Sequence, residues 1–398
     1  SSKLYPTPGP IRVNNRIIYK EGLRMPTFSI DHKNYLNVTE QPLSGSSLSN
    51  WLKILAENHF DIDFQFIPRA IYVTAMMTAL APFRYYEHQK FHKKLTQVSV
   101  KEPIFIIGHF RSGTTFLHYL LGQDKNLGYV STFETMTPGM IIANEEMFCN
   151  LVKNHLPAKR PMDDLEMHAN LPYEEEYAIA NMSKYSFYHG WYFPRRWNHY
   201  FDNYVLFKNS STKKINAWKK TYDYFLKKIT YKNNGNHVLL KSIVNTARIK
   251  HLVNMYPKAR FIHIHRNPYH VYKSTWKLYQ KILPIFSFQH IDTNTLDHYI
   301  LETYKKLFNK FLSDKHLIPK ENLIEFSYDE FTQKPVKTLQ KTYQKLGLTG
   351  FNEAKPALDA YADKHKNYKP AQYTFTKKEK QKVLKHWKFM FDAYQYPQ

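Results

Sequence analysis

The chain of 398 residues has one cysteine, Cys149. A single thiol excludes an intramolecular disulfide and any metal site built from several thiolates, and it is typical of a reducing compartment. A long hydrophobic run is also missing, because the longest uncharged stretch, Ala70–Phe83, is shorter than the roughly 20 residues that span a bilayer. The first residues show no basic segment followed by an apolar run, as a secretory signal would. We therefore expect a cytoplasmic protein.

Acidic residues are scarce relative to basic ones: 33 Asp and Glu stand against 57 Lys and Arg, for a formal net charge of +24. Such a chain should attract anions. Aromatic residues are unusually abundant at 16%. Two interpretations stay open, a general compositional bias or a site lined with rings for an apolar or planar ligand. Basic and aromatic residues are scattered along the chain rather than clustered, so nucleic acid is not an expected partner.

The chain divides by pattern into an N-terminal arm and one long domain. Residues 1–45 are polar and rich in proline, which predicts an irregular arm, and residues 46–398 form the domain. Its first part, 46–100, has helical spacing, with a helix after Ser47 or Ser49 and another over Pro68–Lys94 that kinks near Pro82. These helices are expected to be core elements. The alternative is a basic amphipathic element that rests on an anionic membrane surface.

From residue 101 short apolar runs alternate with helical stretches, which predicts an α/β fold with a central parallel sheet and helices on both faces. Helices are expected to begin near residues 114, 247, 268, 296 and 331. We assign 101–350 to this core, 140–236 to an insertion that shapes a pocket, and 351–398 to a C-terminal closing segment with a final helix. The expected strands are Ile104–Ile107, Tyr129–Phe133, Val238–Leu240, Phe261–Ile264 and Leu323–Phe326.

The most informative run connects the first of these strands to a helix. Gly108 and Gly113 have the spacing of a phosphate-binding loop, in which small residues let the backbone wrap an anion. Arg111 adds a full charge, and the helix that begins at Thr114 adds its dipole. A nucleoside triphosphatase would have Lys in place of Thr114 and an Asp for magnesium after a strand, but here a strand ends in His265-Arg266. The loop therefore favours an anion that needs no metal.

These residues resemble the 5′-phosphosulfate loop of sulfotransferases that use 3′-phosphoadenosine-5′-phosphosulfate (PAPS). The resemblance implies that Arg266 and Ser274, which follow a second apolar strand, hold the 3′-phosphate. It is strongest to bacterial members and covers roughly residues 42–394. It also implies that a C-terminal segment closes over the nucleotide. The implied nucleotide-binding residues are Arg111, Ser112, Gly113, Thr114, Thr115, Phe116, Arg266, Ser274, His365 and Lys366. The further matching segments are Gly108–Asp124, Arg160–Asp164, Leu171–Tyr177, Leu240–Ser242, Thr246–Arg248 and His365–Tyr368.

Sulfuryl transfer needs a base for the acceptor hydroxyl and cations for the leaving phosphate. The resemblance implies that Lys241 steadies the bridging oxygen. Cytosolic animal members have a catalytic His two residues later, where this chain has Ile243, so the base must come from elsewhere. Glu134 is our first candidate. The rival is the acidic cluster Glu174–Glu176, with Glu174 and Glu175 favoured, and His168 is a third possibility.

His263 and His265 alternate on a strand without further ligands at zinc-like spacing, so we interpret them as core histidines and predict no metal. The sequence thus predicts a PAPS-dependent sulfotransferase, with a P-loop kinase or a membrane-surface protein as weaker alternatives. The apolar, Met-containing N-terminal helices favour a lipophilic acceptor such as a sterol, lipid or phenol. Asn, Asp and Trp in 140–200 keep a carbohydrate or glycolipid acceptor as the alternative. Peripheral contact with a membrane is a further expectation.

Overall fold

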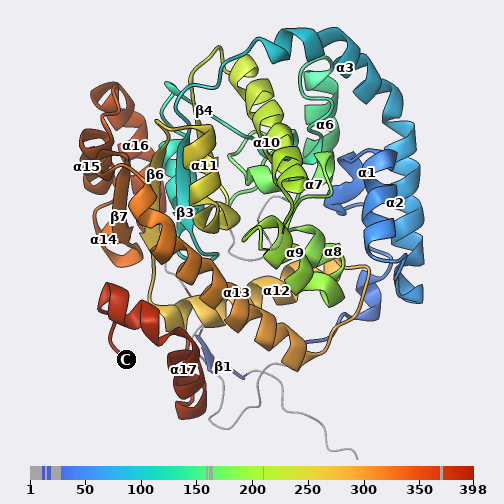
Figure 1. Ribbon diagram of the computed structural model, residues 1–398. Helices are drawn as coiled ribbons and strands as arrows, with labels where there is room; N and C mark the ends of the chain where they lie inside the picture. Colours follow the sequence, from blue (N-terminus) through green and yellow to red (C-terminus); the bar gives the residue numbers. More distant parts are fainter. Residues whose placement is uncertain are drawn as a thin grey trace, which may run out of the picture.

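A five-stranded parallel sheet forms the centre of the molecule (Figure 1). The computed structural model describes residues 11–13, 16–18, 28–157, 160, 165–208, 210–367 and 371–398. The strand order is β4-β5-β3-β6-β7, and every neighbouring pair is parallel. This confirms the predicted fold class. The strands are β3 (Ile104–Gly108), β4 (Leu127–Tyr129), β5 (His237–Lys241), β6 (Arg260–His265) and β7 (Leu323–Ser327).

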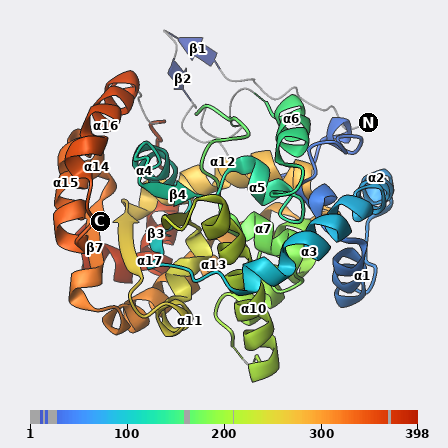
Figure 2. The ribbon, with the colours of Figure 1, turned by 90° about the horizontal axis from the view of Figure 1, so that it is seen from above.

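Helices surround this sheet and continue into a large helical part on one side of it (Figures 1 and 2). The α-helices are α1 (Leu48–Glu57), α2 (Ile67–Ala79), α3 (Ala81–Thr96), α4 (Thr114–Leu121), α5 (Thr132–Met136), α6 (Glu145–His155), α7 (Glu175–Met182), α8 (His189–Tyr192), α9 (Trp197–Tyr204), α10 (Thr212–Lys232), α11 (Ile249–Met255), α12 (Pro268–Phe286), α13 (Thr293–Asp314), α14 (Tyr328–Gln333), α15 (Pro335–Leu346), α16 (Phe351–His365) and α17 (Lys377–Tyr394). Short 3-10 helices include η1 (His32–Asn34), η2 (Pro42–Gly45), η5 (Ile243–Ala247) and η6 (Lys315–Leu317).

Strand β3 is buried along its whole length because both faces of the sheet are covered. Ile104 and Ile106 belong to a core shared with α4, α15 and α16. Phe105 and Ile107 alternate with them and belong to the larger core on the opposite face, which includes side chains of α10, α12 and α13. This two-sided burial explains why the strand reads as an uninterrupted apolar run.

The central position of β3 decides where the functional loops meet. Its neighbours are β5 and β6, with Ile106 opposite Lys241 and Gly108 opposite Ile264. Carboxyl ends of parallel strands lie at one edge of a sheet, where α/β proteins bind their ligands. The loop after β3, the end of β5 and the segment after β6 therefore lie side by side.

The N-terminal helices α1, α2 and α3 pack at the outside of the helical part (Figures 1 and 2). The predicted kink near Pro82 is present as a break between α2 and α3, which meet at an angle of 42°. No single helix in the described residues has the length and apolar character of a membrane span, although 64–79 and 81–96 have both when taken together. Strands β1 (Ile11–Val13) and β2 (Arg16–Ile18) pair within the N-terminal arm, which was expected to be irregular.

The strand predicted over 129–133 is wrong, because β4 ends at Tyr129. Ser131 instead caps α5 and forms a capping box with Glu134, so the chain turns into a helix. Three helices begin near but not at the predicted residues. Helix α11 follows η5 and begins at Ile249, while Asp292 caps α13 and Ser327 caps α14 a few residues earlier than expected.

Candidate active site

The loop between β3 and α4 depends on two glycines. Gly108 has φ +147°, and a Cβ there would lie 2.4 Å from the carbonyl oxygen of Ile264 on the neighbouring strand. Gly113 has φ +94°, and a Cβ there would lie 2.5 Å from the ring of Tyr328. Both positions therefore require glycine, for the backbone conformation and for the close approach of neighbours. Arg111 between them also has a left-handed backbone, at φ +68°.

The two predicted phosphate-binding elements are in direct contact. The Arg111 Nε donates to the Ser274 Oγ at 2.8 Å, and the Arg266 guanidinium donates to the Arg111 carbonyl at 3.0 Å. Arg266 also lies over the ring of Tyr328, 3.9 Å from its centroid. The loop after β3 and the start of α12 thus form the wall of one site. Separation of these elements would have contradicted the predicted nucleotide site.

A cavity of about 880 Å³ opens at this wall. Nine of the ten residues predicted to bind the nucleotide line it, and Ser112 does not. Ser112 is buried, and its backbone N–H donates to the His109 carbonyl within the loop. Residues 161–164 and Tyr368, which belong to two of the matching segments, lie outside the described residues.

The cavity is strongly basic, with six Lys and Arg side chains against two carboxylates, Asp359 and Asp363. Burial lowers the pKa of Arg266, and the charge of nearby Arg111 lowers it further. An anion between these guanidiniums would relieve their repulsion. The basic residues are Arg111, Arg266, Lys277, Lys334, Lys337 and Lys366.

The three adjacent glutamates at the start of α7 point to three different partners. Glu176 forms a fully buried ion pair with Arg248, at 2.6 Å. Glu175 accepts from the Tyr222 hydroxyl at 2.7 Å and the Asn245 amide at 2.6 Å. Burial raises the pKa of Glu175 to about 7. Both carboxylates are part of the protein core.

Of the three, only Glu174 faces the loop between β3 and α4, residues 108–115, which we call the anion loop. Its carboxylate accepts hydrogen bonds from the Lys241 Nζ at the end of β5 and from the Tyr188 hydroxyl. Burial lowers the pKa of Lys241, and burial together with the Glu174 charge raises that of Tyr188. Glu174 also lines a narrow gap of about 30 Å³, whose walls include Arg111 and Thr114. A carboxylate therefore lies beside the loop predicted to hold the phosphosulfate.

This gap shares lining residues with two larger cavities of opposite character. Arg111, Thr114 and Thr115 line both the gap and the basic cavity. Arg160, Tyr173 and Ile282 line both the gap and a mostly apolar cavity of about 180 Å³. Residues of α2 and α12 and several methionines form the apolar walls: Tyr72, Met76, Leu80, Met136, Met167, Ile285 and Phe286.

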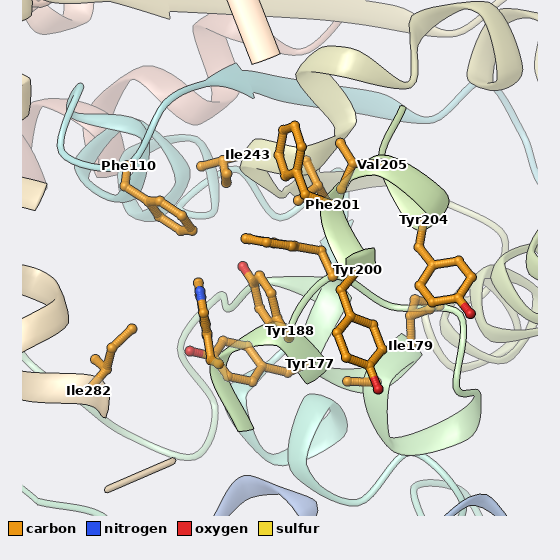
Figure 3. Close-up of a cluster of buried hydrophobic side chains, with 14 of the residues drawn as sticks. Phe110, Tyr177, Ile179, Tyr188, Tyr200, Phe201, Tyr204, Val205, Ile243 and Ile282 are labelled. Carbon is orange, nitrogen blue, oxygen red and sulfur yellow. The ribbon is translucent and has the colours of Figure 1, made fainter. Parts of the chain in front are cut away.

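Buried aromatic side chains form part of the wall of the gap and pack behind it (Figure 3). The hydroxyls of Tyr177 and Tyr188 point toward the side where Phe110 and Ile282 lie. The Tyr188 ring stacks on Trp191 with centroids 3.9 Å apart, and Phe110, Tyr177 and Trp191 line the gap. Part of the high aromatic content thus surrounds the site, and part fills the core behind it.

A sequence model of the sulfotransferase family matches residues 103–353. The chain belongs to the sulfotransferase family. It is 28% identical over 353 residues to the omega-hydroxy-beta-dihydromenaquinone-9 sulfotransferase Stf3 of Mycobacterium bovis and of Mycobacterium tuberculosis, which covers 88% of this chain and 90% of the relative.

Two crystal structures share the fold of this sulfotransferase. Sulfotransferase STF9 from Mycobacterium avium superposes with a TM-score of 0.64 at 15% identity, covering 88% of this chain and 97% of the other. Sulfotransferase STF1 from Mycobacterium tuberculosis superposes with a TM-score of 0.61 at 17% identity, covering 90% and 93%.

Two other predicted bases lie away from the gap. In the described part of the sulfotransferase, Glu134 lines none of the three cavities. It closes the capping box of α5 and forms an ion pair with Lys232 at 2.6 Å. His168 is exposed. The capping-box spacing of Ser131 and Glu134 is a sequence signal that could have identified this structural role.

The histidines of β6 have partners within the protein. His263 is buried and its Nδ1 lies 2.8 Å from the Glu325 carboxylate, while the Nδ1 of His265 lies 2.7 Å from the Tyr396 hydroxyl. Among the described residues, no group of three or more His, Cys, Asp and Glu side chains has the arrangement of a metal site.

Sequence reasoning missed several residues of the basic cavity. Lys277 lies on α12 one turn after Ser274, and its Nζ lies 4.7 Å from the centroid of the Tyr373 ring. Lys334 and Lys337 come from the end of α14 and the start of α15. The spacing from Ser274 could have indicated Lys277, since residues three apart share a helix face.

Proposed function

We propose that this sulfotransferase transfers a sulfuryl group from PAPS to the hydroxyl of a lipophilic molecule, with Glu174 as the general base. The observation that carries the proposal is that the narrow gap, which Glu174 lines, shares wall residues with a basic cavity and with an apolar one. A polyanionic donor fits the basic cavity, an apolar acceptor fits the apolar one, and their reactive groups would meet at the gap.

The basic cavity suits PAPS by size and charge. Its volume of about 880 Å³ lies within the range of pockets that enclose a cofactor-sized ligand. Arg111 and the N-terminus of α4 would hold the phosphosulfate end, and Arg266 with Ser274 the 3′-phosphate. His365 and Lys366, at the end of α16, would cover the nucleotide, as the resemblance implies.

In the proposed reaction the acceptor oxygen attacks sulfur, and the bond between sulfur and the bridging phosphate oxygen breaks. The electron pair of that bond stays on the phosphate, and the hydroxyl proton passes to the Glu174 carboxylate. The products are a sulfate ester and adenosine 3′,5′-bisphosphate. Most of the rate would come from alignment and from the cations around the leaving phosphate.

Lys241 contacts Glu174, and it lines neither the basic cavity nor the gap as described. We therefore assign Lys241 to positioning: it fixes the direction of the carboxylate and compensates its charge. Arg111, Thr114 and Thr115 line both the basic cavity and the gap, and we propose that they contact the bridging oxygen, the role that the resemblance implies for Lys241.

The apolar cavity favours a lipid over a carbohydrate. Most of its surface is apolar, although Glu40, His155 and Arg160 also line it, so it offers more contact to a hydrocarbon chain than to a sugar. The mycobacterial relative is named for action on a hydroxylated dihydromenaquinone, and by analogy we propose an acceptor with a long apolar chain and a terminal hydroxyl.

A screen of acceptors with PAPS as the donor tests this proposal. The protein is incubated with PAPS and with prenyl alcohols, sterols, phenols, glycolipids or free sugars, and products are identified by mass spectrometry. We expect sulfated prenyl alcohols or other lipids. The variant Met76→Trp, which fills the apolar cavity, should raise the KM for the lipid without changing affinity for adenosine 3′,5′-bisphosphate. Sulfation of sugars alone would contradict the proposed acceptor class.

A further inference from the structure

Helix α2 has two apolar faces, which is unusual for a helix at the surface of a protein. On its inner face Tyr72 and Met76, followed by Leu80 at the end of the helix, line the apolar cavity of the proposed acceptor site. Its outer face also lacks charge. The exposed outer positions are Ile67, Pro68, Ile71, Ala75, Thr78 and Ala79.

Large apolar side chains extend this outer face at both of its ends. Before α2, Phe60 is 63% exposed and Phe64 is 83% exposed. On α2 itself Ile71 is 64% exposed, and Phe83 at the start of α3 is 37% exposed. Between Phe60 and Phe83 the charged residues are Asp61 and Asp63, which both form ion pairs with Arg195, and Arg69, which is buried and donates to carbonyls of the core. A continuous exposed patch of this kind marks an interaction site.

A groove between α1 and α2 belongs to the same face. Its volume is about 830 Å³, and every residue that lines it is uncharged. Figures 1 and 2 both place α1 and α2 at the periphery, away from α14–α16, and the outer positions of α2 are exposed. The outer face therefore lies open along the whole of α2, a length of about 20 Å.

Along α3, next to this face, tyrosines are followed by lysines, which is the order from the interface to the headgroups of a bilayer. Tyr85 and Tyr86, 67% and 49% exposed, come directly after the apolar positions. Exposed lysines follow at Lys90, Lys93 and Lys94 on α3. The carboxylate of α3, Glu87, is buried against Lys228 and does not offset them. Aromatic rings with hydroxyls suit the interface, and lysines suit anionic headgroups.

We propose that the outer face of α2, with Phe60, Phe64, Phe83 and the lysines of α3, docks on the surface of an anionic phospholipid bilayer. The inference deepens the proposed function, because the inner face of the same helix lines the acceptor cavity. A lipid acceptor then passes from the bilayer beside α2 into the cavity without crossing water, and its hydroxyl reaches Glu174 at the gap.

Vesicle co-sedimentation of the full chain tests this docking. Vesicles of phosphatidylcholine mixed with phosphatidylglycerol should bind the protein, and vesicles of phosphatidylcholine alone should bind it less. Ile71→Glu should weaken binding about tenfold or more, because one exposed apolar side chain is replaced by a charge that the bilayer and its headgroups repel. Lys93→Gln with Lys94→Gln should reduce the preference for phosphatidylglycerol while leaving binding to phosphatidylcholine unchanged.

Leu317→Glu is the matched control. Leu317 is 39% exposed on η6, between α13 and β7, so its substitution should leave vesicle binding unchanged. Ile71 and Phe64 are exposed and belong to no catalytic contact, so Ile71→Glu and Phe64→Ser should both retain affinity for adenosine 3′,5′-bisphosphate. That affinity shows that a variant is folded.

Three results would overturn the inference: no sedimentation of the wild-type chain with anionic vesicles, equal binding by Ile71→Glu and wild type, or a wild-type dimer in light scattering that Ile71→Glu converts to monomer. The last would assign the face to a second copy of the chain. Vesicle binding without lipid sulfation would contradict the proposed acceptor and support the docking surface, so the two proposals fail separately.

Discussion

Glu174→Gln separates the proposed base from the neighbouring carboxylates. The amide has nearly the same volume as the carboxylate and can accept one hydrogen bond from Lys241 or Tyr188, the two donors that Glu174 contacts. It cannot take up a proton from the acceptor hydroxyl. A positioned general base contributes about 10²- to 10⁴-fold, so turnover should fall by that factor, or about 3–5 kcal/mol in activation free energy.

The effect on stability should be smaller. Lys241 would lose its counter-charge while buried, and one of its hydrogen bonds would weaken, which costs about 1–3 kcal/mol. The Lys241 pKa, already lowered by burial, should fall further, so the lysine can become neutral and limit this cost. Glu174 does not line the basic cavity, so affinity for adenosine 3′,5′-bisphosphate should stay unchanged.

Single-turnover transfer from PAPS to the lipid acceptor is the suitable assay, because it excludes product release. Glu175→Gln and Glu134→Gln are the matched controls, each a carboxylate-to-amide change away from the gap. Turnover should fall in Glu174→Gln and stay near the wild-type rate in both controls. Wild-type turnover in Glu174→Gln, or a larger loss in Glu134→Gln, would refute the assignment of the base.

Four further predictions concern the loop, the cavity and the core. Gly108→Ala should abolish adenosine 3′,5′-bisphosphate binding in calorimetry, because its Cβ would lie 2.4 Å from the Ile264 carbonyl oxygen. Lys277→Ala should weaken that binding and reduce its dependence on salt. Lys250 does not line the cavity, so Lys250→Ala should change neither. Arg248→Met should lower the free energy of unfolding by about 3–5 kcal/mol in urea, because Glu176 would keep a buried, unpaired charge. Burial raises the Glu175 pKa from 4.5 to about 7, so the folded state holds a proton that the unfolded state loses, and stability should fall as pH rises from 4.5 through 7. Glu175→Gln should remove this decline and leave the protein more stable at neutral pH, by up to about 3 kcal/mol; an unchanged pH dependence would contradict the buried carboxylate.

The sheet and the anion loop could be predicted because their signals are local. Strand β3, the glycines at 108 and 113, and the Arg266–Ser274 spacing each lie within a short segment. Parallel pairing then brings their ends together without further information. Lys334, Lys337 and Tyr373 were not predicted, because they enter the cavity only through the docking of α14, α15 and the segment after α16.

Which of the three adjacent glutamates faces the anion loop could not be read from the sequence. Successive residues of a helix point about 100° apart, so three adjacent glutamates must face three directions. Which of them faces the loop depends on how α7 packs against α5 and α10, a contact between segments far apart in the sequence. Burial then assigns Glu176 to Arg248 and Glu175 to Tyr222, and leaves Glu174 at the gap.

The large positive charge divides into separate groups of residues, which one nucleotide alone would not explain. Six basic side chains line the basic cavity, while Lys53, Lys90, Lys93 and Lys94 are exposed on α1 and α3, which both contact α2. Charges in solvent interact weakly beyond about 10 Å at ordinary salt, so distant groups act independently. Substitutions at Lys277 should therefore change nucleotide affinity without changing vesicle binding, and those at Lys93 and Lys94 should do the reverse. If a variant at Lys277, or one at Lys93 and Lys94, lost both nucleotide affinity and vesicle binding, a single basic surface would bind both ligands.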